Sequence, residues 1–242
     1  MKARDWKIVC FEEVTSTNDK AAEYAQTMCD EKLVIKAKKQ TAGRGRRGRS
    51  WLSLEGNLFF SILLEYNEQN PGMLVIISAL SLWQSIKFIA PSADVWLKWP
   101  NDVLLNGKKV SGILLEKAGE KHMIIGIGVN IVQSPQNEEM LYPTVSLKES
   151  GIDVSADDFL QIYLKQFDGN MNSLQKNGFE HLRQQWIANA KGIGAEIAVQ
   201  QHNKQICGIF RGIDENANLL LQENTKLHKI LAGDVFYKEE KK

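Results

Sequence analysis

Residues 95–116 read VWLKWPNDVLLNGKKVSGILLE, and this stretch predicts a pair of adjacent strands. Asn106-Gly107 lies between two apolar runs, 103–105 and 109–116. An Asn-Gly pair in that position indicates a two-residue type I′ turn, because both central residues of the turn need positive φ. We therefore expect the two runs to be antiparallel neighbours in one sheet.

Lys98 stands in the strand expected over 95–99, immediately before the turn at Pro100. Side chains alternate between the two faces of a strand, so Lys98 points away from the apolar face that carries Leu97 and Trp99. An ammonium group in this position indicates either a site residue or an ordinary solvent-exposed lysine. The strand alone leaves both interpretations open.

The flanking sequence predicts further strands and helices. The run 58–64 is apolar on both faces, which implies burial within a sheet. The run 73–89 is apolar around most of its circumference but is interrupted by Ser, Gln and Lys, so we expect a buried helix rather than a membrane span. Further expected elements are strands over 33–37 and 123–130, helices capped by Ser16-x-x-Asp19 and Ser155-x-x-Asp158, a helix around 179–186 and a polar loop over 132–144.

The pattern changes after Ala190 to short strand-like runs separated by turn residues. Roughly 50 residues of this kind suit a small antiparallel β-barrel that leans on a larger domain. We therefore divide the chain into a domain over residues 1–190 and a small C-terminal domain over 191–242. The expected strands of the small domain are 195–199, 206–213, 219–222, 229–231 and 235–237.

The composition is that of a soluble globular protein, with 242 residues of which 43% are hydrophobic and 24% charged. The three cysteines, Cys10, Cys29 and Cys207, are widely spaced and form no C-x-x-C pair. They indicate buried or bystander thiols in a reducing compartment. No secretory signal is visible at the N-terminus, and we expect a cytoplasmic protein without a membrane segment.

The net charge of +1 conceals a strongly basic window. Residues 36–49 contain seven Lys and Arg and no acidic residue, so the rest of the chain carries a charge of −6. A general nucleic-acid binder usually spreads basic residues over a whole face. The charge distribution argues against that class and assigns the cationic character to one loop.

This loop, residues 40–51, reads QTAGRGRRGRSW. Its glycines let the backbone approach a ligand, and its four arginines supply planar donors for carboxylate or phosphate oxygens, so the loop favours an anionic ligand. The alternative is a solvated basic loop or an RGG-like RNA contact. A Walker A loop is excluded because no G-x-x-x-x-G-K-[ST] occurs, and a dinucleotide-binding fold is rejected because residues 51–56 lead into a strand rather than a helix.

The chain resembles the catalytic domain of biotin protein ligases over about residues 8–190. The resemblance rests on S-T-N at 16–18, the loop 40–51 with Ser53 and Gly56 behind it, K-W-P-N-D at 98–102, S-G-I-L-L-E at 111–116 and G-I-G-V-N at 126–130. The combination of G-R-G-R-R-G-R with a later K-W-P-N-D is highly specific. The resemblance implies an α+β fold with a mixed, mostly antiparallel sheet, helices packed on it, and a small C-terminal SH3-like β-barrel.

The same resemblance implies a two-step reaction. The carboxylate of biotin attacks the α-phosphorus of ATP to give biotinyl-5′-AMP and pyrophosphate, and the acyl group then passes to a lysine of a biotin carboxyl carrier protein. ATP and Mg²⁺ are the expected cofactors. We name no metal ligand, because Mg²⁺ often binds mainly through phosphates and waters.

The resemblance also implies roles for individual residues. Lys98 reaches the biotin carboxylate, and Lys98 and Arg46 act in catalysis. The implied biotin-binding residues are Ser16, Thr17, Asn18, Gln40, Gly43, Arg44, Gly45, Arg46 and Lys98. The implied nucleotide-binding residues are Arg46, Arg47, Arg49, Trp51, Asn101 and Asn130, with Asp102 shaping the site beside Asn101.

Some members of this family carry an N-terminal winged helix-turn-helix and act as repressors. Here the S-T-N segment begins almost at once, so we expect a monofunctional ligase with neither a DNA nor a membrane partner. A homodimer that uses the strand over 109–116 as an edge is left open. Two rival functions also remain, a lipoate protein ligase with the same general fold and chemistry, and a non-catalytic RNA-binding module that uses the basic loop.

Overall fold

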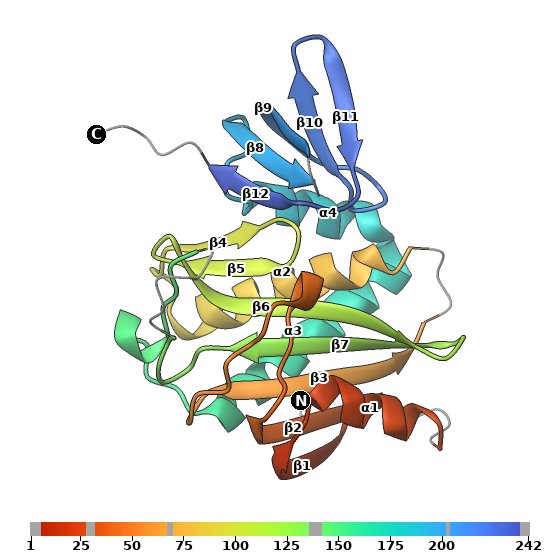
Figure 1. Ribbon diagram of the computed structural model, residues 1–242, viewed down its shortest axis with the longest axis vertical. Coiled ribbons are helices and arrows are strands. Elements are labelled where there is room, and N and C mark those ends of the chain that lie inside the picture. Colours follow the sequence, from red (N-terminus) through yellow and green to blue (C-terminus); the bar gives the residue numbers. More distant parts are fainter. Residues whose placement is uncertain (1–5, 28–31, 67–69, 136–141, 202–203, 238–242) are drawn as a thin grey trace.

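A computed structural model of the chain describes residues 6–27, 32–66, 70–135, 142–201 and 204–237 (Figure 1). Its larger part is built on a seven-stranded sheet with the strand order β1-β2-β3-β7-β6-β5-β4. β1 and β2 are parallel, and the other neighbouring pairs are antiparallel, which confirms the expected mixed, mostly antiparallel sheet. The strands are β1 (Trp6–Val14), β2 (Lys32–Gln40), β3 (Leu58–Glu65), β4 (Val95–Lys98), β5 (Asp102–Leu105), β6 (Lys108–Ala118) and β7 (His122–Val129).

The β5–β6 hairpin forms at the Asn-Gly turn as the sequence predicts. Asn106 has φ 52° and Gly107 has φ 76°, so both central residues adopt the positive φ of a type I′ turn. β6 pairs with β5 over Lys108–Gly112 and with β7 over Ser111–Ala118, so Ser111 and Gly112 lie between both neighbouring strands. The suggested dimer edge is thus already paired on both sides over part of its length, and the homodimer stays a prediction.

Helices cover both faces of the sheet (Figure 1). α1 (Thr17–Ala25) packs on one face over a small apolar cluster that contains Ala21, Leu33 and Leu63. α2 (Gly72–Ile89), α3 (Ala156–Asn177) and α4 (Phe179–Ala188) pack on the other face and share its main apolar core. Among the described residues, α2 is the one helix long and apolar enough to cross a membrane, and 56% of it is buried inside the fold. It is a core helix, as the sequence predicts.

The N-terminal strand β1 was not expected from the sequence. Its apolar residues do not alternate regularly, since Ile8, Val9, Cys10 and Phe11 follow one another. The strand lies at the edge of the sheet, where parallel pairing with β2 supplies its hydrogen bonds. Cys10 in this strand is an exposed free thiol, like Cys207, and Cys29 lies outside the described residues.

The C-terminal part is a second, five-stranded antiparallel sheet with the order β11-β10-β9-β8-β12. No pairing closes β11 onto β12 among the described residues, so the expected small barrel is an open sheet. It leans on the larger part, as expected, and the Trp99 indole donates a hydrogen bond of 3.1 Å to the carbonyl of Ala217. The boundary between residues 190 and 191 stays a prediction. The strands are β8 (Glu196–Gln201), β9 (Lys204–Ile213), β10 (Leu219–Glu223), β11 (Lys226–Ile230) and β12 (Asp234–Tyr237).

Candidate active site

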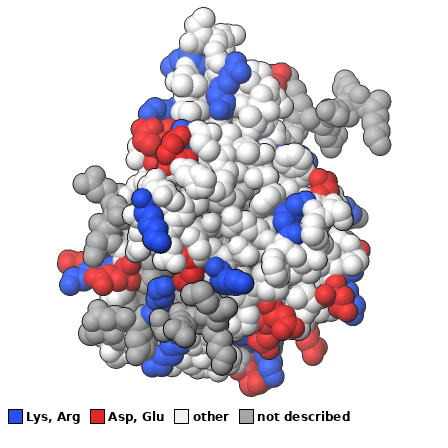
Figure 2. All heavy atoms as spheres, turned by 180° about the vertical axis from the view of Figure 1, so that it is seen from behind, with Lys and Arg blue, Asp and Glu red and all other residues white. Residues whose placement is uncertain are grey.

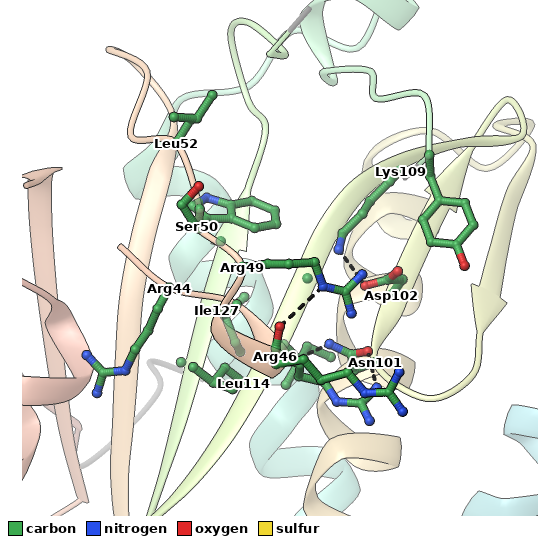
Figure 3. Close-up of a pocket in the computed structure, with 18 of the residues that line it drawn as sticks. Arg44, Arg46, Arg49, Ser50, Leu52, Asn101, Asp102, Lys109, Leu114 and Ile127 are labelled. Atoms are coloured by element: carbon green, nitrogen blue, oxygen red, sulfur yellow. Dashed lines mark hydrogen bonds and ion pairs between the residues drawn. The ribbon is translucent and has the colours of Figure 1, made fainter. Parts of the chain in front are cut away.

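A cavity of about 810 Å³ opens on the α1 side of the sheet. It lies between the N-terminus of α1, the basic loop, strands β4 to β7 and the start of β12. Figure 3 shows part of its lining, including Arg46, Asn101, Asp102 and Lys109. Of the site residues that the sequence predicted, only Gly43 does not line it. The lining residues from that prediction are Ser16, Thr17, Asn18, Gln40, Arg44, Gly45, Arg46, Arg47, Arg49, Trp51, Lys98, Asn101, Asp102 and Asn130.

The start of α1 presents polar atoms to the cavity. Ser16 caps the helix, and its hydroxyl accepts a hydrogen bond of 3.2 Å from the backbone N–H of Asn18. Asp19, which the sequence suggested as the partner in a capping box, instead lies 2.7 Å from the guanidinium of Arg44. The helix start is therefore fixed by a single cap, and its acidic residue is turned toward the basic loop.

A buried hydrogen-bond network orders the next residues. The backbone N–H and the hydroxyl of Thr17 both donate to Gln40 Oε1, at 2.8 and 3.1 Å. The Ser61 hydroxyl lies 2.7 Å from Thr17 Oγ1 and 2.6 Å from Asn18 Oδ1. Asn18 Nδ2 donates to Glu116 at 2.6 Å. Donors and acceptors held in this way are suited to a neutral polar ligand group such as a urea.

The glycines of β6 and β7 make room for side chains that cross the sheet face. A Cβ at Gly126 would overlap the side chain of Asn18, and a Cβ at Gly128 would come within 2.5 Å of Trp51 Nε1. Gly112, which pairs with Gly128 across the two strands, also faces the Trp51 ring. The G-I-G segment was uninformative in the sequence, and the structure gives its physical reason: only glycine lets Asn18 and the indole lie flat on the sheet.

Arg44 is the first arginine of the basic loop, and its guanidinium turns away from Arg46 and Arg49 (Figure 3). It donates two hydrogen bonds to the Glu116 carboxylate, at 3.0 and 2.8 Å, and contacts Asp19. These hydrogen bonds to Glu116 and Asp19 raise the pKa of Arg44 above its usual value. Its charge is therefore balanced by two carboxylates, and it closes the α1 end of the cavity.

Arg47 and Arg49 reach across to the C-terminal sheet. Arg47 Nη1 lies 2.8 Å from one carboxylate oxygen of Asp234, and Arg49 Nη2 lies 2.9 Å from the other. A short 3₁₀ helix, η1 (Arg46–Gly48), carries the loop into this position, and Arg47 within it has φ 56°. The loop is thus fastened to the first residue of β12.

Arg46 also lines the cavity, and among the described residues it differs from the other three arginines in forming no ion pair. It donates a hydrogen bond of 3.2 Å to Asn101 Oδ1, and Asn101 Nδ2 in turn donates a hydrogen bond of 2.6 Å to the carbonyl of Ile113. Burial lowers the pKa of Arg46 below its usual value. Within the described residues no carboxylate lies within 4 Å of this guanidinium, so its positive charge is not neutralised.

Lys98, at the end of β4, is buried and is a second cation without an ion-pair partner among the described residues. Its side chain is 3% exposed, which shows that the interpretation of this lysine as solvent-exposed is wrong. Burial lowers its pKa to about 7, although the neighbouring carboxylate of Asp102 partly opposes the shift. Asp102 itself forms an ion pair of 2.7 Å with Lys109. In the described part of the chain, Lys98 contacts the aromatic rings of Tyr142 and Tyr237 instead of a carboxylate.

Several residues of the site were missed in the sequence. Glu116 had an available signal, since it ends the S-G-I-L-L-E segment directly after the apolar run 113–115, and Lys109 follows from the hairpin register that pairs β5 with β6. Tyr142 and Asp234 had no such signal, because they reach the cavity only through tertiary packing. In the described ranges, no group of three or more His, Cys, Asp or Glu is placed to hold a metal ion.

The back of the molecule does not extend the basic loop into a larger cationic surface. On the face seen in Figure 2, Lys and Arg residues are interspersed with Asp and Glu. A broad single-sign field is the usual footprint of a general nucleic-acid binder. The cationic groups that distinguish this chain are those that line the cavity.

Comparisons with protein families place the chain among known sequences. The model of the Biotin/lipoate A/B protein ligase family matches residues 10–130, and that of the Biotin protein ligase C terminal domain matches residues 192–238. The chain is 35% identical to a biotin–[acetyl-CoA-carboxylase] ligase of Paracoccus denitrificans, over 92% of this chain and 97% of that protein. It is 33% identical to the bifunctional ligase/repressor BirA of Bacillus subtilis, over 94% of this chain and 73% of that protein.

Solved structures agree with these matches. A biotin protein ligase from Aquifex aeolicus, in complex with biotin and ATP, superposes with a TM-score of 0.84 at 30% identity, and the match covers 95% of this chain and 97% of that one. A biotin protein ligase from Leishmania major in complex with biotinyl-5-AMP has a TM-score of 0.68 at 23% identity, which supports the fold alone.

Proposed function

The chain belongs to the Biotin/lipoate A/B protein ligase family, and we propose how its cavity performs the ligase reaction. The protein is an ATP-dependent ligase that activates biotin as biotinyl-5′-AMP and transfers biotin to a carboxylase carrier. The alternative of a lipoate protein ligase is not favoured, because the similar proteins reported above are named as biotin ligases. Each step of this reaction makes its own demand on the side chains of the cavity.

The first step must bring two anions together. A carboxylate oxygen of biotin attacks the α-phosphorus of ATP, the bond from that phosphorus to the β-phosphate oxygen breaks, and pyrophosphate leaves. Electrostatic repulsion between carboxylate and triphosphate opposes the approach, and fixed cations in a water-poor site reduce it. The catalytic task is therefore one of charge placement.

One observation carries the assignment: Lys98 and Arg46 line the same cavity, and neither has a carboxylate partner among the described residues. Each is held by uncharged groups, Arg46 by Asn101 and Lys98 by aromatic rings. A cation held without a counter-ion in a buried site attracts an incoming anion far more strongly than one in water. We assign Lys98 to the biotin carboxylate and Arg46 to the α-phosphate between the two substrates.

The two ends of the cavity are assigned to the two substrates. The network around α1 and Gln40 would bind the ureido ring, since it presents fixed neutral donors and acceptors. Trp51 and Asn130 border the opposite end and would bind the nucleotide, together with Asn101, Arg47 and Arg49. Arg44 would act on the biotin end indirectly, because Glu116 and Asp19 hold its guanidinium.

The second step needs the adenylate to survive until the carrier arrives. The lysine amine of the carrier, in its neutral form, attacks the acyl carbon, AMP leaves and a proton is released. Water would hydrolyse the mixed anhydride, so the basic loop that covers the cavity would also protect it. Mg²⁺ would enter with ATP, bound by phosphates and water, since the described residues offer no carboxylate cage.

The test is covalent transfer in a defined mixture. Purified protein is incubated with labelled biotin, ATP, Mg²⁺ and a generic biotin-carrier domain, and label on the carrier is measured together with released pyrophosphate. A carrier whose acceptor lysine is replaced by arginine is the matched control. Label on the control carrier, or preferential transfer of lipoate, would contradict the assignment. Sedimentation of the same sample measures whether the protein is a homodimer.

A further inference from the structure

The head of Lys98 is surrounded by aromatic rings from two distant segments. Its Nζ lies 2.8 Å from the ring centroid of Tyr142 and 5.8 Å from that of Tyr237. Lys191 Nζ also lies near this second ring, 5.3 Å from the centroid of Tyr237. The two rings come from the segment before η2 (Lys148–Ser150) and from β12, far from Lys98 in the sequence.

The C-terminal sheet holds the Tyr142 ring in this position. The Tyr142 hydroxyl donates a hydrogen bond of 2.8 Å to the carbonyl of Val235, and its ring packs against Phe236 with a centroid separation of 5.8 Å. Burial raises the pKa of both the Tyr142 and Tyr237 phenols, so both rings stay neutral and the hydroxyl remains a donor. Three consecutive residues of β12 thus build the surroundings of Lys98: Val235 accepts the Tyr142 hydrogen bond, Phe236 packs against the Tyr142 ring, and Tyr237 supplies the second ring.

We propose that Tyr142 and Tyr237 form an aromatic cage that keeps the Lys98 ammonium dry and fixed in place for adenylate formation, and that β12 positions this cage. The catalytic part of the proposal rests on the function proposed above. The faces of aromatic rings attract a cation without cancelling its charge, whereas a carboxylate would cancel it. The two tyrosines are therefore positioning residues that act through Lys98.

The charged groups around the cage are consistent with this role. Asp102 on β5 lies close to Lys98 but forms its ion pair with Lys109 on β6. Asp234 on β12 is engaged by Arg47 and Arg49 of the basic loop. Lys191, between α4 and β8, opposes the charge of Lys98. Both of these described carboxylates are thus engaged by other cations, and the cage leaves the Lys98 charge available to an incoming carboxylate.

The experiment is an NMR titration of Lys98 in the full-length protein, with lysine labelled by ¹³C at Cε. The resonance is assigned by its loss in Lys98→Arg. We expect a wild-type midpoint near 7. Tyr142→Ala lets water replace the ring, and because water hydrates an ammonium better, the midpoint is expected to rise by about one pH unit or more. Tyr142→Phe loses the hydrogen bond to Val235 but keeps the ring and its packing against Phe236, so its midpoint is expected to stay close to wild type. Tyr24→Ala, remote on α1, is the control.

Pyrophosphate release by the same variants tests the catalytic part. At pH 5.5, more than one unit below the expected midpoint, Lys98 is largely protonated in every variant. There Tyr142→Ala is expected to lower kcat about tenfold by loosening the ammonium, and Tyr142→Phe to restore it. An unchanged midpoint in Tyr142→Ala, or a Tyr142→Phe variant that behaves like Tyr142→Ala, overturns the cage. If wild-type protein releases no pyrophosphate, the proposed function fails, and the titration still decides whether the cage exists.

Discussion

Replacement of Lys98 by methionine is expected to stabilise the folded protein while abolishing adenylate formation. Methionine keeps the apolar stem of lysine and removes the buried ammonium. Burial lowers the pKa of Lys98 from 10.5 to about 7. Between these two values the unfolded chain binds more protons than the folded one, so stability rises with pH across that window. The cost of the charge is therefore fully present below pH 7 and lost as the pH approaches 10.5.

The magnitude follows from the size of this shift. One pKa unit corresponds to about 1.4 kcal/mol, so the charge costs about 4 kcal/mol at pH 7 and about 1.4 kcal/mol at pH 9.5. Contact with the face of the Tyr142 ring offsets up to about 2 kcal/mol of this cost. Lys98→Met is therefore expected to raise the free energy of unfolding by about 2–4 kcal/mol at pH 7, but by only about 1.4 kcal/mol at pH 9.5, where Lys98 in the folded protein is already largely neutral.

Urea denaturation followed by tryptophan fluorescence at the two pH values measures this difference. Lys108→Met, at the exposed first position of β6, is the matched control and is expected to change stability by less than about 0.5 kcal/mol at either pH. A Lys98→Met protein that is less stable than wild type at pH 7, or whose gain is equal at both pH values, would refute the reasoning. Retained pyrophosphate release would refute the catalytic role of Lys98.

Three further substitutions test other parts of the site. Gly128→Ala places a Cβ within 2.5 Å of Trp51 Nε1, so displacement of the indole is expected to raise the KM for ATP about tenfold in a steady-state assay. The control Gly169→Ala meets open space in α3 and is expected to leave the KM for ATP unchanged. Glu116→Gln removes the charge that holds Arg44, and isothermal titration is expected to show biotin binding weakened about tenfold, whereas an unchanged Kd would separate Arg44 from the biotin end. Arg46→Gly removes the cation assigned to the α-phosphate, and a chase of labelled adenylate is expected to show release about tenfold faster; unchanged release would exclude that role.

Local chemistry accounts for most of what the sequence predicted about the fold. The Asn106-Gly107 turn needs only two residues to specify its backbone, and it formed as expected. The apolar runs of β3 and α2 indicate burial by themselves. β1 was missed because its pairing partner β2, rather than any regular alternation of its own, makes it a strand. Closure of the C-terminal strands into a barrel was expected, and an open sheet is observed in the described residues.

The residue types of the candidate site were also readable, because an anionic ligand requires cations and close backbone approach, and the loop 40–51 and K-W-P-N-D supply both. The composition of the loop does not distinguish its four arginines, and only the family resemblance implied separate roles for them. Tertiary structure divided them: Glu116, which is 72 residues from Arg44, neutralises that side chain, and Asp234, which is 187 residues from Arg47, holds another. Arg46 remains without such a partner in the described part of the chain.

Spacing along the chain therefore determined which groups this protein carries and on which face of a strand each one stands. Only the folded structure decided which charges remain available, because a charge is cancelled by whatever carboxylate lies within a few ångströms, and desolvation depends on segments that join the site from far away. Lys98 shows both contributions. Alternation along β4 turned its side chain from the apolar face, whereas the Tyr142 ring, held by β12, buries its ammonium without pairing it with a carboxylate.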